Sequence, residues 1–248
     1  MTRIPVLIPH LPSAQQGHEL RLAIEGWRRH FKTPHQIAIM GENLPDIPGV
    51  IKVESPRVED VPGEYRQHLD YVKCVRKAHE LFQNTTGFVV AADDVFAVND
   101  FTLADIKHPK IQEATLPTKG ADGHPNLWRR NLAKTGLVCQ REGYAMLNWT
   151  THLPHYYTWK RLLALYDKHD CDHNSYVVEN LYYNAYPPRE KPELLGRNDR
   201  WKFEVSYSPL DRKGLYDAFA HKVWVTTTEN GWSPEMEEAI ARHYGIEL

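Results

Sequence analysis

Alternation of short apolar runs with amphipathic stretches in the first hundred residues constrains this fold more than any other feature. Two segments, 17–31 and 65–84, repeat apolar residues at the spacing of one helical face. Four apolar runs around them have the length and composition of strands: 4–10, 36–41, 49–55 and 88–92. The resulting order, strand, helix, strand, strand, helix, strand, is typical of an α/β sandwich with a largely parallel sheet.

Beyond residue 100 the periodic signals are weaker. Clusters of Gly, Pro and Asp over 104–136 predict a loop-rich connection with a short helix at 128–134. Ser233 has the residue type and position of an N-cap for a final helix, with Glu237 nearby. The other elements predicted in this part are a strand at 144–151, a helix from about 157 and a helix at 173–186.

Composition excludes several classes of protein. Of the 248 residues 42% are hydrophobic, and 30 Lys and Arg balance 32 Asp and Glu, so net charge gives no argument for nucleic-acid or membrane binding. No apolar run approaches the roughly 18 residues that a membrane span needs. The three cysteines lack CxxC spacing, so we expect buried thiols rather than disulfides or a cysteine zinc site. These features predict a cytoplasmic protein.

Two adjacent carboxylates, Asp93 and Asp94, end the apolar run 88–92. Burial and mutual repulsion both disfavour their charged forms, so the pair needs solvent, a shared proton or a cation. Three interpretations follow: a solvated turn, an acid/base dyad as in hydrolases, or a site for a divalent cation that also binds phosphates. Ligands of open α/β sheets bind beyond the carboxyl ends of strands, where this pair is expected, which favours the cation site.

The stretch ADDVF also resembles the DxD-type signature of GT-A fold glycosyltransferases, in a variant with two adjacent aspartates. Five further segments are similar, in the same order, to segments of Stealth-like sugar and sugar-phosphate transferases: HELRLAIEGWRRHF, IMGENLPDIPGVIKV, TTHLPHYYTWKRL, NSYVVENLYYNAY and VSYSPLDRKG. The resemblance covers most of the chain and extends to phage and bacterial glycosyltransferases. It implies a GT-A-like (Rossmann-like) α/β/α sandwich with a mostly parallel central sheet and a helical C-terminal part. Residues 1–248 would form one domain, with a nucleotide-sugar-binding half at 1–100 and an acceptor half with a C-terminal extension at 101–248.

This resemblance implies a metal-dependent glycosyltransferase. Such an enzyme moves a sugar from a nucleotide-sugar, here expected to be a UDP-sugar, to a hydroxyl of a saccharide or another acceptor, with Mn²⁺ or Mg²⁺ as cofactor. Stealth-type transfer of a sugar 1-phosphate and glycosylation of a hydroxymethylated DNA base remain open. A non-catalytic nucleotide-sugar-binding module and a phosphoesterase that uses the two carboxylates are the alternatives from other classes.

The resemblance also implies roles for single residues. Asp94 and Asp93 would bind the metal together with His152, since neutral imidazole suits Mn²⁺. A structural histidine in a turn is the plain alternative for His152, and His155 and His173 are the other candidates. Glu179 is the expected catalytic base, with Asp170 and Asp172 as alternatives.

Several charged residues are candidates for binding the donor. Guanidinium groups bind phosphate oxygens in pairs, so arginines dominate the set, although a solvated basic helix face explains some of them equally well. Trp128 could stack on a sugar or a base. The expected cofactor-binding residues are His10, Glu19, Arg21, Arg66, Lys73, Asp93, Arg129 and Arg130.

Overall fold

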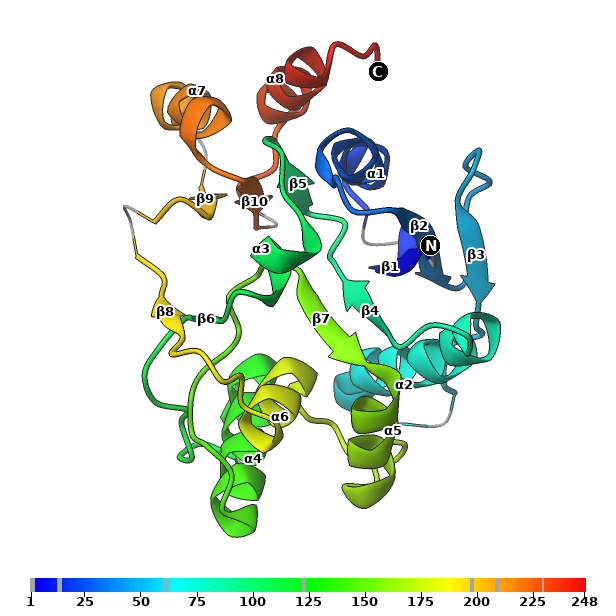
Figure 1. Cartoon of the computed structure of the whole chain (residues 1–248), viewed down its shortest axis with the longest axis vertical. Coiled ribbons are helices and arrows are strands. Elements are labelled where there is room, and N and C mark those ends of the chain that lie inside the picture. Colours follow the sequence, from blue (N-terminus) through cyan, green and yellow to red (C-terminus); the bar gives the residue numbers. More distant parts are fainter. Residues whose placement is uncertain are drawn as a thin grey trace.

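A five-stranded sheet lies at the centre of the fold (Figure 1). The computed structural model describes residues 3–12, 15–59, 61, 63–121, 124–196, 199–207, 210–228 and 230–248. The strands are β1 (Ile4–His10), β2 (His35–Gly41), β3 (Ile51–Glu54), β4 (Gly87–Val90) and β7 (His155–Thr158), in the order β3-β2-β1-β4-β7. The first four are parallel, and β7 runs antiparallel to β4. The prediction of an α/β fold with a mostly parallel central sheet is therefore confirmed.

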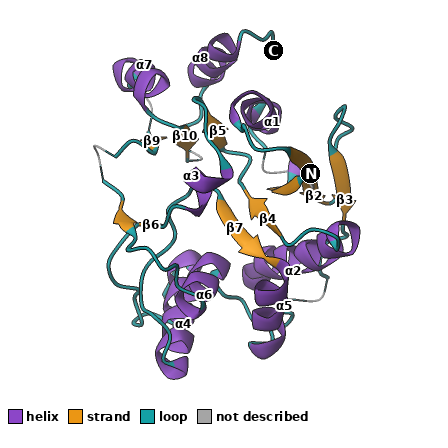
Figure 2. Cartoon of the chain, in the orientation of Figure 1, coloured by secondary structure: helices purple, strands orange, loops and turns teal. Residues whose placement is uncertain are grey.

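Helices cover both faces of this sheet (Figure 2). Because successive side chains of a strand point to opposite faces, β1 contributes to two separate cores. Val6 and Ile8 pack in a cluster with residues of α1 (Glu19–His30). Leu7 packs in a second cluster with residues of α2 (Gly63–Phe82), α5 (Trp159–Lys168), α4 (Leu127–Glu142) and α6 (Val178–Ala185).

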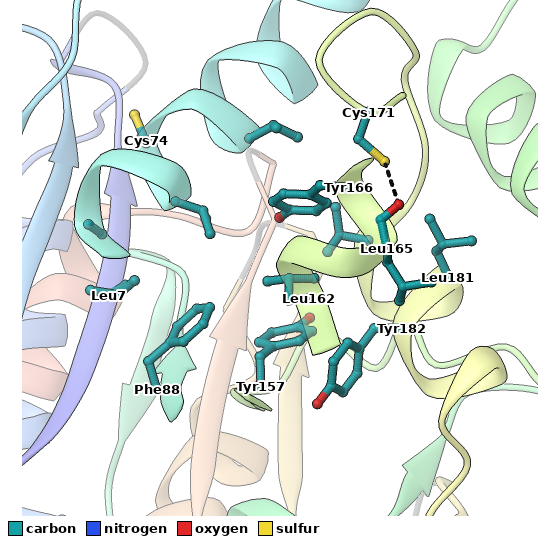
Figure 3. Close-up of a cluster of buried hydrophobic side chains, with 14 of the residues drawn as sticks. Leu7, Cys74, Phe88, Tyr157, Leu162, Leu165, Tyr166, Cys171, Leu181 and Tyr182 are labelled. Atoms are coloured by element: carbon teal, nitrogen blue, oxygen red, sulfur yellow. Dashed lines mark hydrogen bonds between the residues drawn. The ribbon is translucent and has the colours of Figure 1, made fainter. Parts of the chain in front are cut away.

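Aromatic side chains join the sheet to the helices in the second core (Figure 3). Phe88 of β4 is fully buried and stacks on Trp159, with ring centroids 3.8 Å apart. Tyr157 of β7 meets Tyr182 of α6 edge to face at 4.9 Å. Stacked and edge-to-face contacts of buried rings add to the free energy gained from burial, so the base of β4 is rigidly held.

A second, three-stranded sheet extends the fold on one side (Figure 1). Its order is β5-β10-β9, from Val95–Ala97, Trp224–Thr227 and Lys202–Val205; β10 is antiparallel to β5 and parallel to β9. Helices α7 (Arg212–His221) and α8 (Pro234–Tyr244) pack in its core. The remaining elements are α3 (Leu103–Lys107) and the parallel pair of β6 (Lys110–Ile111) and β8 (Glu193–Leu194).

Strand order creates a topological switch point between β1 and β4. The chain moves outward from β1 through β2 to β3, and α2 then carries it back to β4 on the other side of β1. The connections from the two neighbouring strands leave in opposite directions, and ligands of open α/β sheets bind at such a point, beyond the carboxyl ends of the strands. β1 ends at His10, and the residues that follow β4 include Asp93 and Asp94.

Three predictions about the second half need correction. The predicted strand at 144–151 does not form: apart from an isolated bridge between Glu113 and Asn148, β7 occupies the place beside β4. The predicted short helix at 128–134 is the much longer α4, and the helix predicted at 173–186 begins only at Val178. The segment VSYSPLDRKG begins at the last residue of β9, and its Ser208 and Pro209 lie outside the described residues.

Two further points concern the helices. The final helix, α8, begins as predicted, since the Ser233 hydroxyl accepts a hydrogen bond from the backbone N–H of Met236 at 3.2 Å. Among the described residues, none of the helices has both the length and the apolar character needed to cross a bilayer.

Candidate functional site

Asp93 and Asp94 lie at the switch point, where β4 ends and the chain turns toward β5. Nδ1 of His10, the last residue of β1, donates a hydrogen bond to Oδ2 of Asp93 at 2.8 Å. His10 is 5% exposed, while the Asp93 side chain is 27% exposed. The contact therefore joins the ends of β1 and β4, and it leaves the Asp93 carboxylate partly accessible. The other ring nitrogen of His10, Nε2, is buried, and no described residue forms a hydrogen bond with it.

His152 lies beside the second carboxylate. Its Nε2 donates to both oxygens of Asp94, at 3.1 Å each. Burial lowers the pKa of His152, but the hydrogen bond and negative charge of Asp94 more than offset it, so the pKa is raised overall. The backbone of His152 has a φ of 55°, in the left-handed region that non-glycine residues rarely adopt. Such conformations persist where the surroundings enforce them, often at functional sites.

Glu19 brings a third carboxylate to the same place. It is the first residue of α1, is 8% exposed and accepts a hydrogen bond from the N–H of Gln16 at 2.9 Å. Burial raises the pKa of Glu19 to about 7; the hydrogen bond opposes this effect, and the nearby charges of Asp93 and Asp94 add to it. The switch point is thus a concentration of negative charge that a cation would relieve.

Glu179 approaches the site from the N-terminal turn of α6. Burial raises its pKa to about 7, against the opposing effects of its own backbone N–H and the charge of His152. Tyr71, Tyr157 and Tyr183 share its surroundings, since its charge in turn affects their pKa values. A half-buried carboxyl with a pKa near neutrality suits proton transfer.

The small sheet also contributes residues that lie near Asp94 and His152. The N–H of Thr227 in β10 donates to the backbone oxygen of Asp94 at 3.2 Å. On β9, Nζ of Lys202 donates to the backbone oxygen of Thr151 at 2.9 Å and pairs with Glu204 at 2.9 Å. Burial raises the pKa of Glu204, but the hydrogen bond and charge of Lys202, with smaller effects of Ser206 and His152, lower it overall.

Two of the predicted donor-binding residues contact other parts of the chain, and a third lies on a helix that does so. Arg21 is exposed on α1 and donates to the backbone oxygen of Glu247 at 2.9 Å. Lys73 is exposed on α2 and donates to the backbone oxygen of Pro56 at 2.9 Å. Arg129 is exposed in the first turn of α4, a helix that packs against α6.

The other two predicted arginines, on α2 and α4, are less exposed. Arg66 is half-buried near the start of α2, and its Nε is buried without a hydrogen-bond partner among the described residues. Arg130 is half-buried beside Arg129, and Trp128 is 45% exposed. The residues that the structure brings together are thus His10, Glu19, Asp93, Asp94, His152 and Glu179.

The alternative histidines and carboxylates have other partners. His155 lies on β7, its ring centroid 5.5 Å from that of Tyr183, and burial lowers its pKa to about 3. His173 is exposed and pairs with Asp170 at 2.7 Å. Asp172 pairs with Arg76 at 2.6 Å. The geometry therefore favours His152 over the other two histidines, and Glu179 over the two aspartates.

The donor set at the switch point fits a cation that keeps ligands from outside the protein. Among the residues that the structure describes, no group of three or more His, Cys, Asp or Glu side chains is arranged to hold a metal ion. Asp93 and Asp94 do offer accessible carboxylate oxygens, with side chains 27% and 29% exposed. Mg²⁺ and similar hard cations are commonly bound through one or two carboxylates together with substrate phosphates and water.

Lys202, Glu204 and Thr227 were not singled out in the sequence. The only signal of the first two is their i, i+2 spacing in KFEV, which places both side chains on one face of a strand. Which face would meet the carboxylate pair depends on the pairing of β9 with β10 and of β10 with β5. That pairing is not visible in local sequence patterns.

Comparison with known proteins gives only distant similarities. No family model and no curated protein matches the chain. A glycosyltransferase involved in the glycosylation of the major capsid of PBCV-1 superposes with a TM-score of 0.42 and 13% identity, over 96% of this chain and 99% of that one. The glycosyltransferase GlyE of Streptococcus pneumoniae TIGR4 gives 0.45 at 9% identity, and its apo form 0.40 at 11%.

These alignments cover 100% and 99% of this chain, but the chain spans only 61% of GlyE. TM-scores below 0.5 at such identities do not establish a shared function. Evidence on function must therefore come from the residues at the switch point.

Proposed function

We propose that this chain is a metal-dependent glycosyltransferase that moves a sugar from a nucleotide-sugar, a UDP-sugar in the first instance, to an acceptor hydroxyl. The observation that carries the proposal is the pair of accessible carboxylates at the switch point, each bound to a histidine from a different segment. The sequence resemblance of ADDVF to DxD-type signatures supports the same function. A site built of carboxylates at the end of a parallel strand suits a diphosphate accompanied by a cation.

Asp93 and Asp94 would hold Mn²⁺ or Mg²⁺, with His152 beside them. When bound, the cation would supply positive charge that stabilises the departing nucleoside diphosphate. His10 orients Asp93 through its hydrogen bond, and His152 does the same for Asp94. Both carboxylates would thus be held ready, so little reorganisation is needed when the donor binds.

Glu179 would act as the base. It would take the proton of the acceptor hydroxyl while the hydroxyl oxygen bonds to the anomeric carbon and the bond from that carbon to the phosphate oxygen breaks. The electron pair of the broken bond leaves with the diphosphate. A pKa of about 7 leaves a substantial fraction of Glu179 ionised at neutral pH and keeps it basic enough to accept a proton.

A thermal-shift screen of nucleotide-sugars, with and without Mn²⁺, tests this proposal. At least one UDP-sugar should raise the melting temperature only in the presence of Mn²⁺, and Asp94→Ala should abolish the effect. Asp46→Ala is the matched control, because Asp46 is 93% exposed in an ion pair with Lys52. No stabilisation by any nucleotide-sugar, or equal stabilisation of the Asp94 variant, would refute the proposal.

The mass of the product identifies the bond that breaks. Transfer of a sugar adds a glycosyl unit to the acceptor and releases a nucleoside diphosphate. Transfer of a sugar 1-phosphate adds a phosphate as well and releases a nucleoside monophosphate. Mass spectrometry of an acceptor incubated with the stabilising donor therefore separates the two reactions.

A further inference from the structure

We propose that Lys202 is a positioning residue: it holds the left-handed turn that places His152 against Asp94. Neither the sequence motifs nor the proposed function assigns a role to Lys202. The proposal concerns the geometry of the free protein. Only its consequence for cation binding rests on the function proposed above.

The turn that carries His152 is anchored on both sides. On the preceding side, the backbone N–H of Trp149 donates to the side-chain oxygen of Asn180 at 2.6 Å. On the following side, Leu153 is buried in the core and the N–H of Tyr156 donates to the hydroxyl of Tyr183 at 3.1 Å. Between these anchors, His152 itself must adopt a φ of 55°.

Lys202 contacts the turn at Thr151, one residue before the left-handed His152. Its Nζ donates to the backbone oxygen of Thr151 at 2.9 Å, and the Thr151 residue is only 1% exposed. That oxygen belongs to the peptide group that joins Thr151 to His152. Fixing its direction therefore constrains the φ of His152, because φ describes rotation about the bond that follows this peptide group.

The Lys202 side chain is itself held in place. It is 13% exposed and pairs with Glu204 at 2.9 Å, while the hydroxyl of Ser206 donates to the other oxygen of Glu204 at 3.1 Å. Lys202 and Glu204 lie on one face of β9, two residues apart. A nearly buried ammonium that is hydrogen-bonded to a carbonyl and a carboxylate has little freedom to move, so it can enforce a backbone conformation that is costly by itself.

Nuclear magnetic resonance on the free protein tests the proposal through Lys202→Met, which keeps an unbranched side chain of similar size and removes the donor. A left-handed His152 gives a strong intraresidue contact between its amide proton and Hα, and its Nε2 proton is protected from exchange by Asp94. Lys202→Met should lose both signals, and Lys202→Arg should keep them. Lys222→Met is the matched control, because half-buried Lys222 donates to the backbone oxygen of Asp199 beside the same small sheet.

Retention of both signals in Lys202→Met, or their equal loss in Lys222→Met, would overturn the proposal. If Lys202→Met does not fold, hydrogen exchange in the wild-type protein still tests the proposal. The ammonium protons of Lys202 should be protected from exchange with water, and free exchange would contradict the contact with Thr151.

The second measurement is the binding of Mn²⁺ in the absence of a nucleotide-sugar. Removal of a group that orients a ligand typically weakens metal binding by 10-fold to 100-fold. We expect Lys202→Met to bind Mn²⁺ about 10-fold more weakly than wild type and Lys202→Arg to be near wild type. If the wild-type protein binds no Mn²⁺, the proposed function fails, whereas the resonance measurements still decide the role of Lys202.

Discussion

Replacement of Glu19 by Gln should stabilise the protein at alkaline pH and much less so at acid pH. Glu19 is 8% exposed beside Asp93 and Asp94, and its pKa is raised from 4.5 to about 7. Gln has nearly the same shape, and its oxygen can still accept the hydrogen bond from the N–H of Gln16. The substitution therefore removes the cost of ionising a buried carboxyl and little else.

The size and sign follow from linkage. Because the folded-state pKa is above the unfolded one, the contribution of Glu19 to stability is fully present below pH 4.5 and is lost as the pH rises through about 7. An increase from 4.5 to about 7 corresponds to about 3 kcal/mol at high pH. Roughly a quarter of this applies at pH 5 and nearly all of it at pH 8. The advantage of Glu19→Gln over wild type should thus grow by about 2–3 kcal/mol between these two pH values.

Urea unfolding at pH 5 and pH 8, in the presence of EDTA, measures this difference. Glu238→Gln is the control, because Glu238 is 69% exposed in a surface ion pair with Arg242 and such pairs are worth at most about 1 kcal/mol. If Glu19→Gln changes the free energy of unfolding equally at both pH values, burial does not govern the protonation of Glu19. The account of the switch point as a concentration of negative charge would then be wrong.

Three other predictions concern residues near the switch point and the N-cap of α8. Gly41→Ala should cost about 1–3 kcal/mol in urea unfolding, because a Cβ there would lie 2.3 Å from the backbone oxygen of His10. Gly196→Ala is the control, since no atom of the described residues beyond its chain neighbours lies within 4 Å of its Cβ position. Ser233→Ala should cost about 1 kcal/mol by the same measurement, through loss of the N-cap of α8, and no loss would mean that the cap contributes nothing. In wild type, kcat/KM should rise with pH through about 7, because Glu179 acts in its ionised form. Glu179→Gln should lower kcat/KM by about 100-fold or more and remove that rise, whereas an unchanged pH profile would exclude Glu179 as the base.

The first half of the fold was predictable because its signals are local. Each helix and strand before residue 91 has its own hydrophobic period, and α1, α2 and the first four strands lie within a few residues of the predicted positions. The position of Asp93 and Asp94 follows from the same pattern, since both come directly after a buried strand. The order of the strands, and with it the contact between His10 and Asp93, required the three-dimensional structure.

The second half was less predictable because tertiary contacts decide its structure. Gly136 was taken as a loop signal, but it lies inside α4, where a Cβ would be 2.1 Å from the backbone oxygen of Pro117. This glycine permits close packing and does not end the helix. The apolar stretch 144–151 reads as a strand, yet the side-chain oxygens of Asn180 and Asn184 bind its backbone N–H groups at Trp149 and Leu147.

Pairing of β5 with β10 has a consequence for biosynthesis. Val95 immediately follows the two carboxylates, and its ladder partner in the small sheet is Thr226, which the ribosome adds much later. The N–H that binds the backbone oxygen of Asp94 belongs to the next residue, Thr227. In a nascent chain that has already formed the central sheet, the residues around Asp93 and Asp94 therefore still lack their contacts with β10. Residues near 227 must therefore leave the ribosome before the backbone oxygen of Asp94 can gain this hydrogen bond.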